Sequence, residues 1–222
     1  MCGRFTVKAT WAELVALYRL TMDAPPHNLR PRYNVCPTDL VDVVTAQREL
    51  VTMRWGLVPW WWSKPIKELR MATFNARAET VETKPVFRDA FKRSRCLIPI
   101  SGYYEWQNTP SGKQPWYFTA ADGSPLLTAA GLWDEWKNRE TGERLKSCTM
   151  IVGEPNELAA EIHERMPVFL MEDQFAAWLS GGGGSGMLEA RAQRLPSTLA
   201  SIEAGNSSKA DADDASLIEP HG

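Results

Sequence analysis

The sequence begins Met1-Cys2, so trimming of the initiator methionine would make a cysteine the amino-terminal residue. That residue would carry an amine and a thiol on adjacent carbons, a pair that no internal residue presents. An α-amino group has a pKa of about 8 and a cysteine thiol of about 8.5, so both are partly reactive at neutral pH. The amine can attack an aldehyde to give a Schiff base. The thiol can then close a five-membered thiazolidine ring in an intramolecular step. Cys2 is therefore predicted to trap an aldehyde, although a small apolar role is the simpler interpretation.

Glu105 lies in an apolar and aromatic stretch, residues 96–107, which predicts a buried strand that is interrupted by Gly102 and ends at Glu105 and Trp106. Its neighbours Tyr103, Tyr104 and Trp106 would partly desolvate the carboxylate and so raise its pKa. A carboxyl group poised closer to neutrality can take up and release protons, as general acid/base catalysis requires. The alternative is a glutamate on the wet face of a half-buried strand.

His163 is the one histidine of three that lies within ordered sequence, because His27 falls in a proline-rich loop and His221 in the tail. It follows a short helical segment, residues 157–162, and precedes Pro167. Histidine titrates in the range that proton transfer needs, although a lone histidine is more often structural.

Residues 74–81 are expected to be extended, which would project Asn75, Arg77 and Glu79 from one face. Without further information these three side chains could equally form a solvated polar face.

Six short segments, taken in their order and spacing, resemble the SRAP (SOS response-associated peptidase) family. They are Met1-Cys2-Gly3-Arg4-Phe5, Arg32-Tyr33-Asn34-Val35-Cys36-Pro37, Arg54-Trp55-Gly56-Leu57-Val58-Pro59, Phe74-Asn75-Ala76-Arg77-Ala78-Glu79-Thr80, Gly102-Tyr103-Tyr104-Glu105-Trp106 and His163-Glu164-Arg165-Met166-Pro167. The resemblance runs from residue 1 to about residue 180.

The resemblance implies a function. SRAP proteins bind single-stranded DNA that holds an abasic site and crosslink to it through the amino-terminal cysteine, as a stable thiazolidine. Carried over, Cys2 would form the crosslink and Glu105 would open the sugar and relay protons. His163 would protonate or stabilise the sugar oxygen and assist reversal, and Asn75 would orient the amine.

The resemblance also implies DNA contacts. Arg4 and Arg77 would hold phosphates beside the lesion, and Asn34 would line the pocket. By charge alone, the two guanidinium groups are expected to lower the pKa of the terminal amine and thiol. Trp61 or Trp62 would stack on a base beside the gap.

Two other functions remain open. Cys2 could be the nucleophile of a peptidase or autoprotease, with self-removal of Met1, since a thiol near an acid and a histidine can transfer acyl groups. Alternatively, the chain could bind single strands without catalysis through its indoles and arginines. Three consecutive indoles, residues 60–62, cannot all point inward, so at least one is expected to be exposed.

The composition limits which kinds of binding site and which cellular locations we expect for this protein. The chain has 222 residues and a formal net charge of -2, so any DNA site must be a local patch. Its four cysteines lack the spacing of a zinc site or a disulfide framework. We expect no metal, no cofactor, no signal peptide and no membrane span. We also expect a monomer in the cytoplasm, associated with the nucleoid when bound to DNA.

The fold class follows from the resemblance and agrees with the strand-rich pattern. We expect an α+β fold, with mostly antiparallel sheets forming a barrel-like or two-sheet core and short helices outside. Thr10 and Glu13 predict a capping box on a short helix. Hairpins are expected over residues 40–55 and 115–133. The whole chain, 1–222, is predicted to be one domain, with a Gly-rich linker at 181–186 and a mobile polar tail at 201–222.

Overall fold

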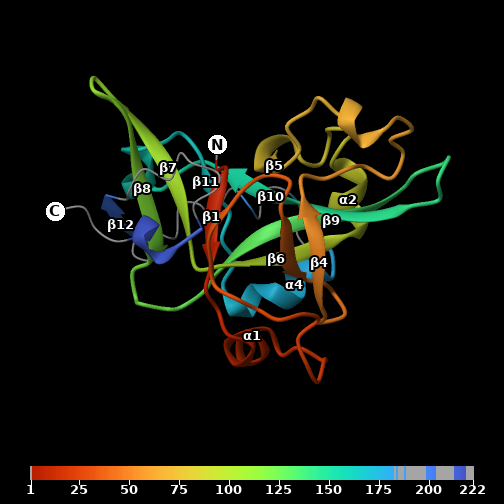
Figure 1. The fold of residues 1–222 in the computed structure, drawn as a ribbon, viewed down its shortest axis with the longest axis horizontal. Coiled ribbons are helices and arrows are strands. Elements are labelled where there is room, and N and C mark those ends of the chain that lie inside the picture. Colours follow the sequence, from red (N-terminus) through yellow and green to blue (C-terminus); the bar gives the residue numbers. More distant parts are fainter. Residues whose placement is uncertain (1, 183, 185–187, 189–198, 204–212, 219–222) are drawn as a thin grey trace.

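The structure, a computed structural model, describes residues 2–182, 184, 188, 199–203 and 213–218. It is built mainly of strands, arranged in two sheets with short helices outside them (Figure 1). This confirms the expected α+β class with a barrel and a second sheet.

The five-stranded sheet is antiparallel throughout. In spatial order its strands are β12 (Leu199–Glu203), β8 (Gly112–Ala120), β7 (Gly102–Thr109), β1 (Arg4–Val7) and β2 (Arg32–Val35). Strands β1 and β7 pair with Arg4 opposite Tyr104. This register carries the residues before Arg4 towards Glu105, so strand pairing alone brings the start of the chain to the glutamate.

The second sheet closes into a barrel, because β9 pairs with both β6 and β10. Around the ring run β10 (Arg144–Gly153), β4 (Leu50–Trp55), β3 (Leu40–Val44), β6 (Arg95–Ile100) and β9 (Leu127–Lys137). Two short strands, β5 (Asn75–Arg77) and β11 (Met166–Pro167), attach to β10. Strand β10 thereby holds the segment with Asn75 and the segment that follows His163.

Helices α1 (Trp11–Tyr18), α2 (Arg88–Arg93), α3 (Glu157–Ala160) and α4 (Phe175–Leu179) surround the sheets, with one-turn helices η1 (Ile66–Glu68), η2 (Ala78–Thr80), η3 (Glu172–Gln174) and η4 (Ala215–Ile218). The capping box of α1 is confirmed. The Glu13 carboxylate accepts a 2.7 Å hydrogen bond from the Thr10 amide, and the Glu13 amide donates to the Thr10 hydroxyl at 3.3 Å. These bonds satisfy two amides that a helix start leaves open.

The hairpin expected over residues 40–55 is confirmed as β3 and β4. The hairpin expected over residues 115–133 is wrong, because β8 and β9 lie in different sheets. The connecting residues carry the chain from one sheet to the other. Strand β8 instead forms a hairpin with β7, through a turn at Thr109 to Gly112.

The strand expected over residues 74–81 is shorter than predicted. It pairs with β10 from Asn75 to Arg77, which lies opposite Val152 one residue before β10 ends. The chain then turns into η2, which buries Ala78. Glu79 therefore does not share a strand face with Asn75 and Arg77.

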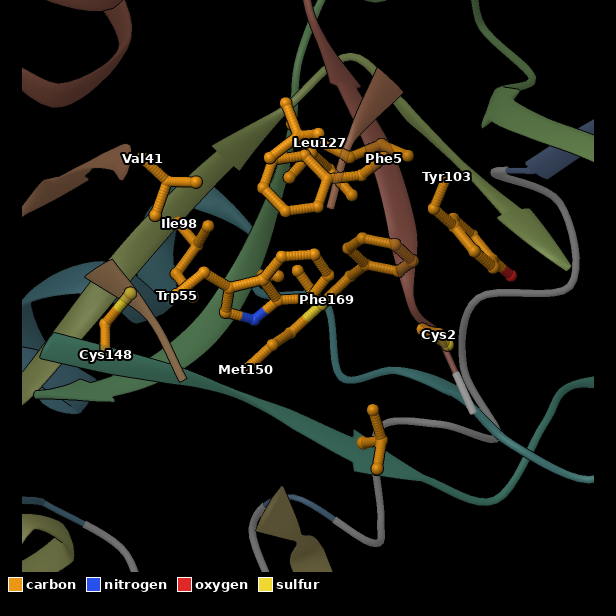
Figure 2. Packing of buried hydrophobic residues seen from close by; sticks show 14 of the residues in the cluster. Cys2, Phe5, Val41, Trp55, Ile98, Tyr103, Leu127, Cys148, Met150 and Phe169 are labelled. Carbon is orange, nitrogen blue, oxygen red and sulfur yellow. The ribbon is translucent and has the colours of Figure 1, made fainter. Parts of the chain in front are cut away.

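One cluster of buried side chains joins the barrel to the five-stranded sheet (Figure 2). Phe5 of β1 packs edge-on against Trp55 of β4, with ring centroids 4.8 Å apart. Cys2 belongs to the same cluster and is 2% exposed. The start of the chain is therefore built into the core, which fixes the backbone that precedes β1.

Within residues 201–222, the structure describes 201–203, the end of β12, and 213–218. Leu217 of η4 is buried against Tyr104 and Tyr117. Of the expected linker at 181–186, Gly181, Gly182 and Gly184 are described. The other residues of both segments lie outside the described part of the chain.

Candidate active site

Four predicted site residues, Cys2, Asn75, Glu105 and His163, come together at one end of β10. The Asn75 side-chain amide donates a 2.8 Å hydrogen bond to the Cys2 carbonyl oxygen. The Cys2 thiol lies 3.9 Å from the Arg165 carbonyl oxygen and also interacts with the Glu105 carboxylate. Residues from β5, β7 and the segment before β11 thus hold Cys2 from three sides.

Glu105 sits on β7 and is only 3% exposed. Burial raises the pKa of its carboxyl above the ordinary value, and the Cys2 thiol and His163 oppose the rise. The direction confirms what the flanking aromatic residues predicted. A buried carboxyl with a raised pKa is suited to exchanging protons with a bound reactant.

The His163 ring faces the same carboxylate, with Nδ1 3.8 Å from Glu105 Oε1. The Arg165 amide nitrogen lies 3.0 Å from Nδ1. Nδ1 also lies 3.3 Å from the Arg165 carbonyl oxygen, so the tautomer of the ring decides whether Nδ1 accepts from the amide or donates to the carbonyl. In both tautomers the Arg165 backbone holds the ring beside the Glu105 carboxylate.

The Cys2 thiol has a pKa well above its ordinary value, because it is buried and because the Glu105 charge opposes a thiolate. The expected lowering of this pKa by Arg4 and Arg77 is wrong in this structure. Arg4 donates a 3.1 Å hydrogen bond to the Asn34 side-chain oxygen, and Arg77 is exposed at the end of β5. Desolvation outweighs any effect of the two guanidinium groups.

An ion pair between Glu79 and Arg165 supports the site from outside. Arg165 Nη2 lies 2.6 Å from Glu79 Oε1, and the two side chains are 19% and 38% exposed. Arg165 also contacts Cys2 and His163 through its backbone. Neither residue of this pair was predicted to act in the site, although both lie within the segments that carry the family resemblance.

Two of the predicted DNA contacts lie on the segments that carry the cluster, Arg4 two residues after Cys2 and Arg77 two residues after Asn75. Asn34 is 3% exposed, and its backbone amide donates a 2.9 Å hydrogen bond to the Asp213 carboxylate. Trp61 and Trp62 are half-buried in the loop between β4 and β5, with ring centroids 6.5 Å apart. Trp60 is 51% exposed, so the expectation of at least one exposed indole is confirmed.

A cavity of about 420 Å³ lies away from Cys2, between the His27 loop and strands β2 to β4. In the part of the chain that the structure describes, no group of three or more His, Cys, Asp or Glu side chains is placed to hold a metal ion. None of the helices described is long and apolar enough to cross a membrane.

Comparison with known proteins decides the family. The family model "SOS response associated peptidase (SRAP)" matches residues 1–204. The chain belongs to the SRAP family. Within SRAP, it is 34% identical to abasic site processing protein YoaM of Bacillus subtilis, over 81% of this chain and 79% of that protein.

Of two further relatives, one has a lower sequence identity to this chain and the other is a longer protein. Abasic site processing protein YedK of Escherichia coli is 29% identical over 81% of this chain and 79% of its own length. Abasic site processing protein HMCES of Xenopus tropicalis is 35% identical over 64% of this chain, which corresponds to 48% of that protein.

The fold also occurs in solved structures. A crystal structure of a Bacteroides thetaiotaomicron protein superposes with a TM-score of 0.89, at 24% identity, covering 99% of this chain and all of that one. One from Bordetella bronchiseptica gives 0.78 at 24% identity, covering 92% of this chain. At this identity the likeness establishes the fold.

Proposed function

We propose that this protein processes abasic sites in single-stranded DNA by forming a covalent thiazolidine through Cys2, once Met1 has been removed. The observation that carries the proposal is the cluster itself, in which Asn75 holds the Cys2 backbone while Glu105 and Arg165 meet its thiol. The names of the relatives, abasic site processing proteins, agree with it.

The chemistry would run in two steps and release one water. The Cys2 amine attacks the C1 aldehyde of the opened sugar, and loss of water leaves an imine. The sulfur then forms a bond to the imine carbon, the π electrons of the C=N bond move to nitrogen, and nitrogen gains a proton. Amine, thiol and aldehyde thereby become a thiazolidine and water, without any oxidant or reductant.

The surrounding groups suit the proton transfers of these steps. Glu105, with its raised pKa, can protonate the departing oxygen and later accept the thiol proton. An N–H of the His163 imidazole can donate to the sugar oxygen while the sugar ring opens. Asn75 keeps the terminal residue in place, so the amine does not need to be ordered again at each step.

Side chains around the cluster would hold the DNA. Arg4 and Arg77 carry positive charges that can bind phosphates, and the side-chain oxygen of Asn34 holds Arg4 by accepting a hydrogen bond from it. Trp61 and Trp62 offer indole faces beside the segment that leads to Asn75. A missing base leaves little stacking to disrupt, which favours extrusion of the lesion into the site.

A peptidase is the competing activity, and the electrostatics of the thiol argue against it. Cysteine peptidases lower the pKa of their nucleophile with a neighbouring imidazolium. Here burial and Glu105 raise the pKa of the Cys2 thiol. Removal of Met1, by the protein itself or by another enzyme, stays compatible with the proposal.

Intact mass spectrometry before and after mixing with an abasic oligonucleotide tests the proposal. The protein should first lack the mass of Met1, and then gain the mass of the oligonucleotide less one water. Cys2→Ala should give no adduct. Cys36→Ala, a change at a partly exposed thiol outside the cluster, should react at the wild-type rate.

An unreactive wild-type protein without Met1, or an adduct on Cys2→Ala at the wild-type rate, would exclude the crosslinking function. Incubation with a peptide library measures the competing activity in the same preparation.

We further propose that the protein acts as a monomer in the cytoplasm and associates with the nucleoid when damage is present. Size-exclusion chromatography with and without abasic DNA measures the oligomeric state.

A further inference from the structure

The Tyr103 hydroxyl is buried without a hydrogen-bond partner among the described residues. Its side chain is 1% exposed. Other buried tyrosines are bonded: the Tyr104 hydroxyl donates to the Tyr33 carbonyl oxygen at 2.8 Å, and Tyr18 shares a 2.8 Å bond with Thr128. A buried hydroxyl without a partner loses its bonds to water and gains nothing in return. Its presence in the core therefore calls for an explanation.

Tyr103 faces the candidate active site. It lies two residues before Glu105 on β7, so the two side chains project from the same face of the sheet. Figure 2 draws Tyr103 and Cys2 on the same side of the core cluster. Burial raises the pKa of the Tyr103 phenol well above its ordinary value, and charge on Cys2 or Glu105 adds to the rise. The hydroxyl therefore keeps its proton at physiological pH.

The ring is held rigidly, so the hydroxyl has a fixed position. Tyr103 stacks on Phe118, with centroids 4.9 Å apart and planes 12° from parallel. Phe169 packs against it at 5.9 Å. A fixed donor needs no reorganisation when charge develops beside it, which is how preorganised groups stabilise a transition state.

The groups that contact the Cys2 thiol are hydrogen-bond acceptors. Its sulfur meets the Arg165 carbonyl oxygen and the Glu105 carboxylate, which are both acceptors. They stabilise the S–H form and oppose negative charge on sulfur. The Arg165 carbonyl can never donate to a sulfur that gives up its proton, and Glu105 can donate only after it has taken that proton, so a separate donor would stabilise the sulfur from the start of the transfer.

We propose that Tyr103 is a further catalytic residue, whose hydroxyl donates a hydrogen bond to the Cys2 sulfur as the thiazolidine ring closes. This rests on the proposed function above. In that step the thiol proton passes to the Glu105 carboxylate and a sulfur electron pair forms the S–C bond. The π electrons of the imine move to nitrogen, which takes up a proton. Tyr103 keeps its own proton throughout.

Tyr103→Phe tests the proposal, because it removes only the hydroxyl. Thiazolidine formation should slow by about tenfold or more, as for loss of one preorganised donor. The imine, trapped with borohydride, should still form at the wild-type rate. The pH midpoint of Cys2 alkylation, read by peptide mass spectrometry without DNA, should move upward. The melting temperature should stay the same or rise, because an unbonded buried hydroxyl has been removed.

Tyr18→Phe is the matched control, since it deletes a bonded hydroxyl away from the site. It should lower the melting temperature and leave crosslinking unchanged. Tyr103→Phe with wild-type ring closure and an unchanged alkylation profile would overturn the inference, as would equal slowing of imine formation and ring closure. If the wild-type protein does not crosslink at all, the proposed function fails, and the alkylation profile still measures whether Tyr103 acts on the Cys2 sulfur.

Discussion

The Asn75 side-chain amide donates a 2.8 Å hydrogen bond to the backbone carbonyl oxygen of Cys2. This bond joins β5, which pairs with the barrel strand β10, to Cys2, which lies two residues before β1 of the other sheet, across 73 positions of sequence. Asn75 Oδ1 is buried and has no partner among the described residues. One end of the amide therefore positions Cys2, and the other is available to a bound reactant.

Asn75→Ala should slow crosslinking by about 10- to 100-fold, because the terminal residue would no longer be held in its reactive geometry. Single-turnover kinetics with an abasic oligonucleotide measure the change. Asn138→Ala, which removes an amide from the turn between β9 and β10, should leave the rate unchanged. A normal rate in Asn75→Ala would mean that the bond has no part in positioning the amine.

Glu105→Gln should change two rates in opposite directions. The Glu105 charge raises the pKa of the Cys2 thiol, so its removal should lower that pKa and speed alkylation of Cys2 several-fold at pH 8. The same variant should crosslink at least tenfold more slowly, because the proton relay is gone. If both rates fall together, the glutamate acts only through the fold.

The stability of Glu105→Gln should depend on pH. Because the folded-state pKa of Glu105 is raised above the ordinary value of 4.5, its charge costs stability above that pH and costs none well below it. The variant should therefore be more stable than wild type at pH 7, by about 0.5–2 kcal/mol. The gain should disappear as the pH falls below about 4. Urea unfolding at both pH values measures it, and an equal gain at both would contradict the assignment.

Glu79→Ala should slow crosslinking several-fold by loosening the Arg165 segment that contacts both Cys2 and His163. Glu172→Ala breaks an exposed ion pair, in which the side chain of Glu172 is 54% exposed and that of Arg19 is 79% exposed. This change should leave the crosslinking rate unaltered. Parallel crosslinking assays at one salt concentration compare the two. Equal effects would show that the Glu79 pair is an ordinary surface contact.

Trp61→Ala and Trp62→Ala should each weaken binding to single-stranded abasic DNA, since stacking contributes about 1–3 kcal/mol per base. In fluorescence anisotropy at fixed salt, that corresponds to roughly 5- to 150-fold in Kd. Cys2 alkylation should be unchanged. Leu40→Ala, at an apolar residue 59% exposed elsewhere, is the control. Loss of binding in Trp60→Ala alone would assign the stacking to the more exposed neighbour instead.

Local patterns and the family resemblance anticipated much of this molecule. The α1 capping box depends on residues three apart, and the rise in the pKa of Glu105 depends on its immediate neighbours. The partner of β8 depends instead on which sheet each strand joins, which alternation of side chains does not encode. The length of β5, the strand that begins at Asn75, likewise depends on its pairing partner β10, which lies far away in the sequence.

The electrostatics of the thiol could not be predicted for a similar reason. The charges of Arg4 and Arg77 can be read from the sequence, but the burial that outweighs them depends on the complete core. Tyr103 went unassigned as a catalytic group, although its place two residues before Glu105 was a usable signal. What marks it is that its hydroxyl has no hydrogen-bond partner among the residues that the structure describes, and only a three-dimensional structure reveals this.

The contact between the Cys2 thiol and the Arg165 carbonyl oxygen spans 163 positions. During synthesis at about 5–20 residues per second, on the order of ten to thirty seconds pass before the ribosome adds the distant half of this contact. The Arg165 contact that helps to enclose the Cys2 thiol therefore forms only after that interval. Translation order would thus let the terminus be processed first and sheltered second.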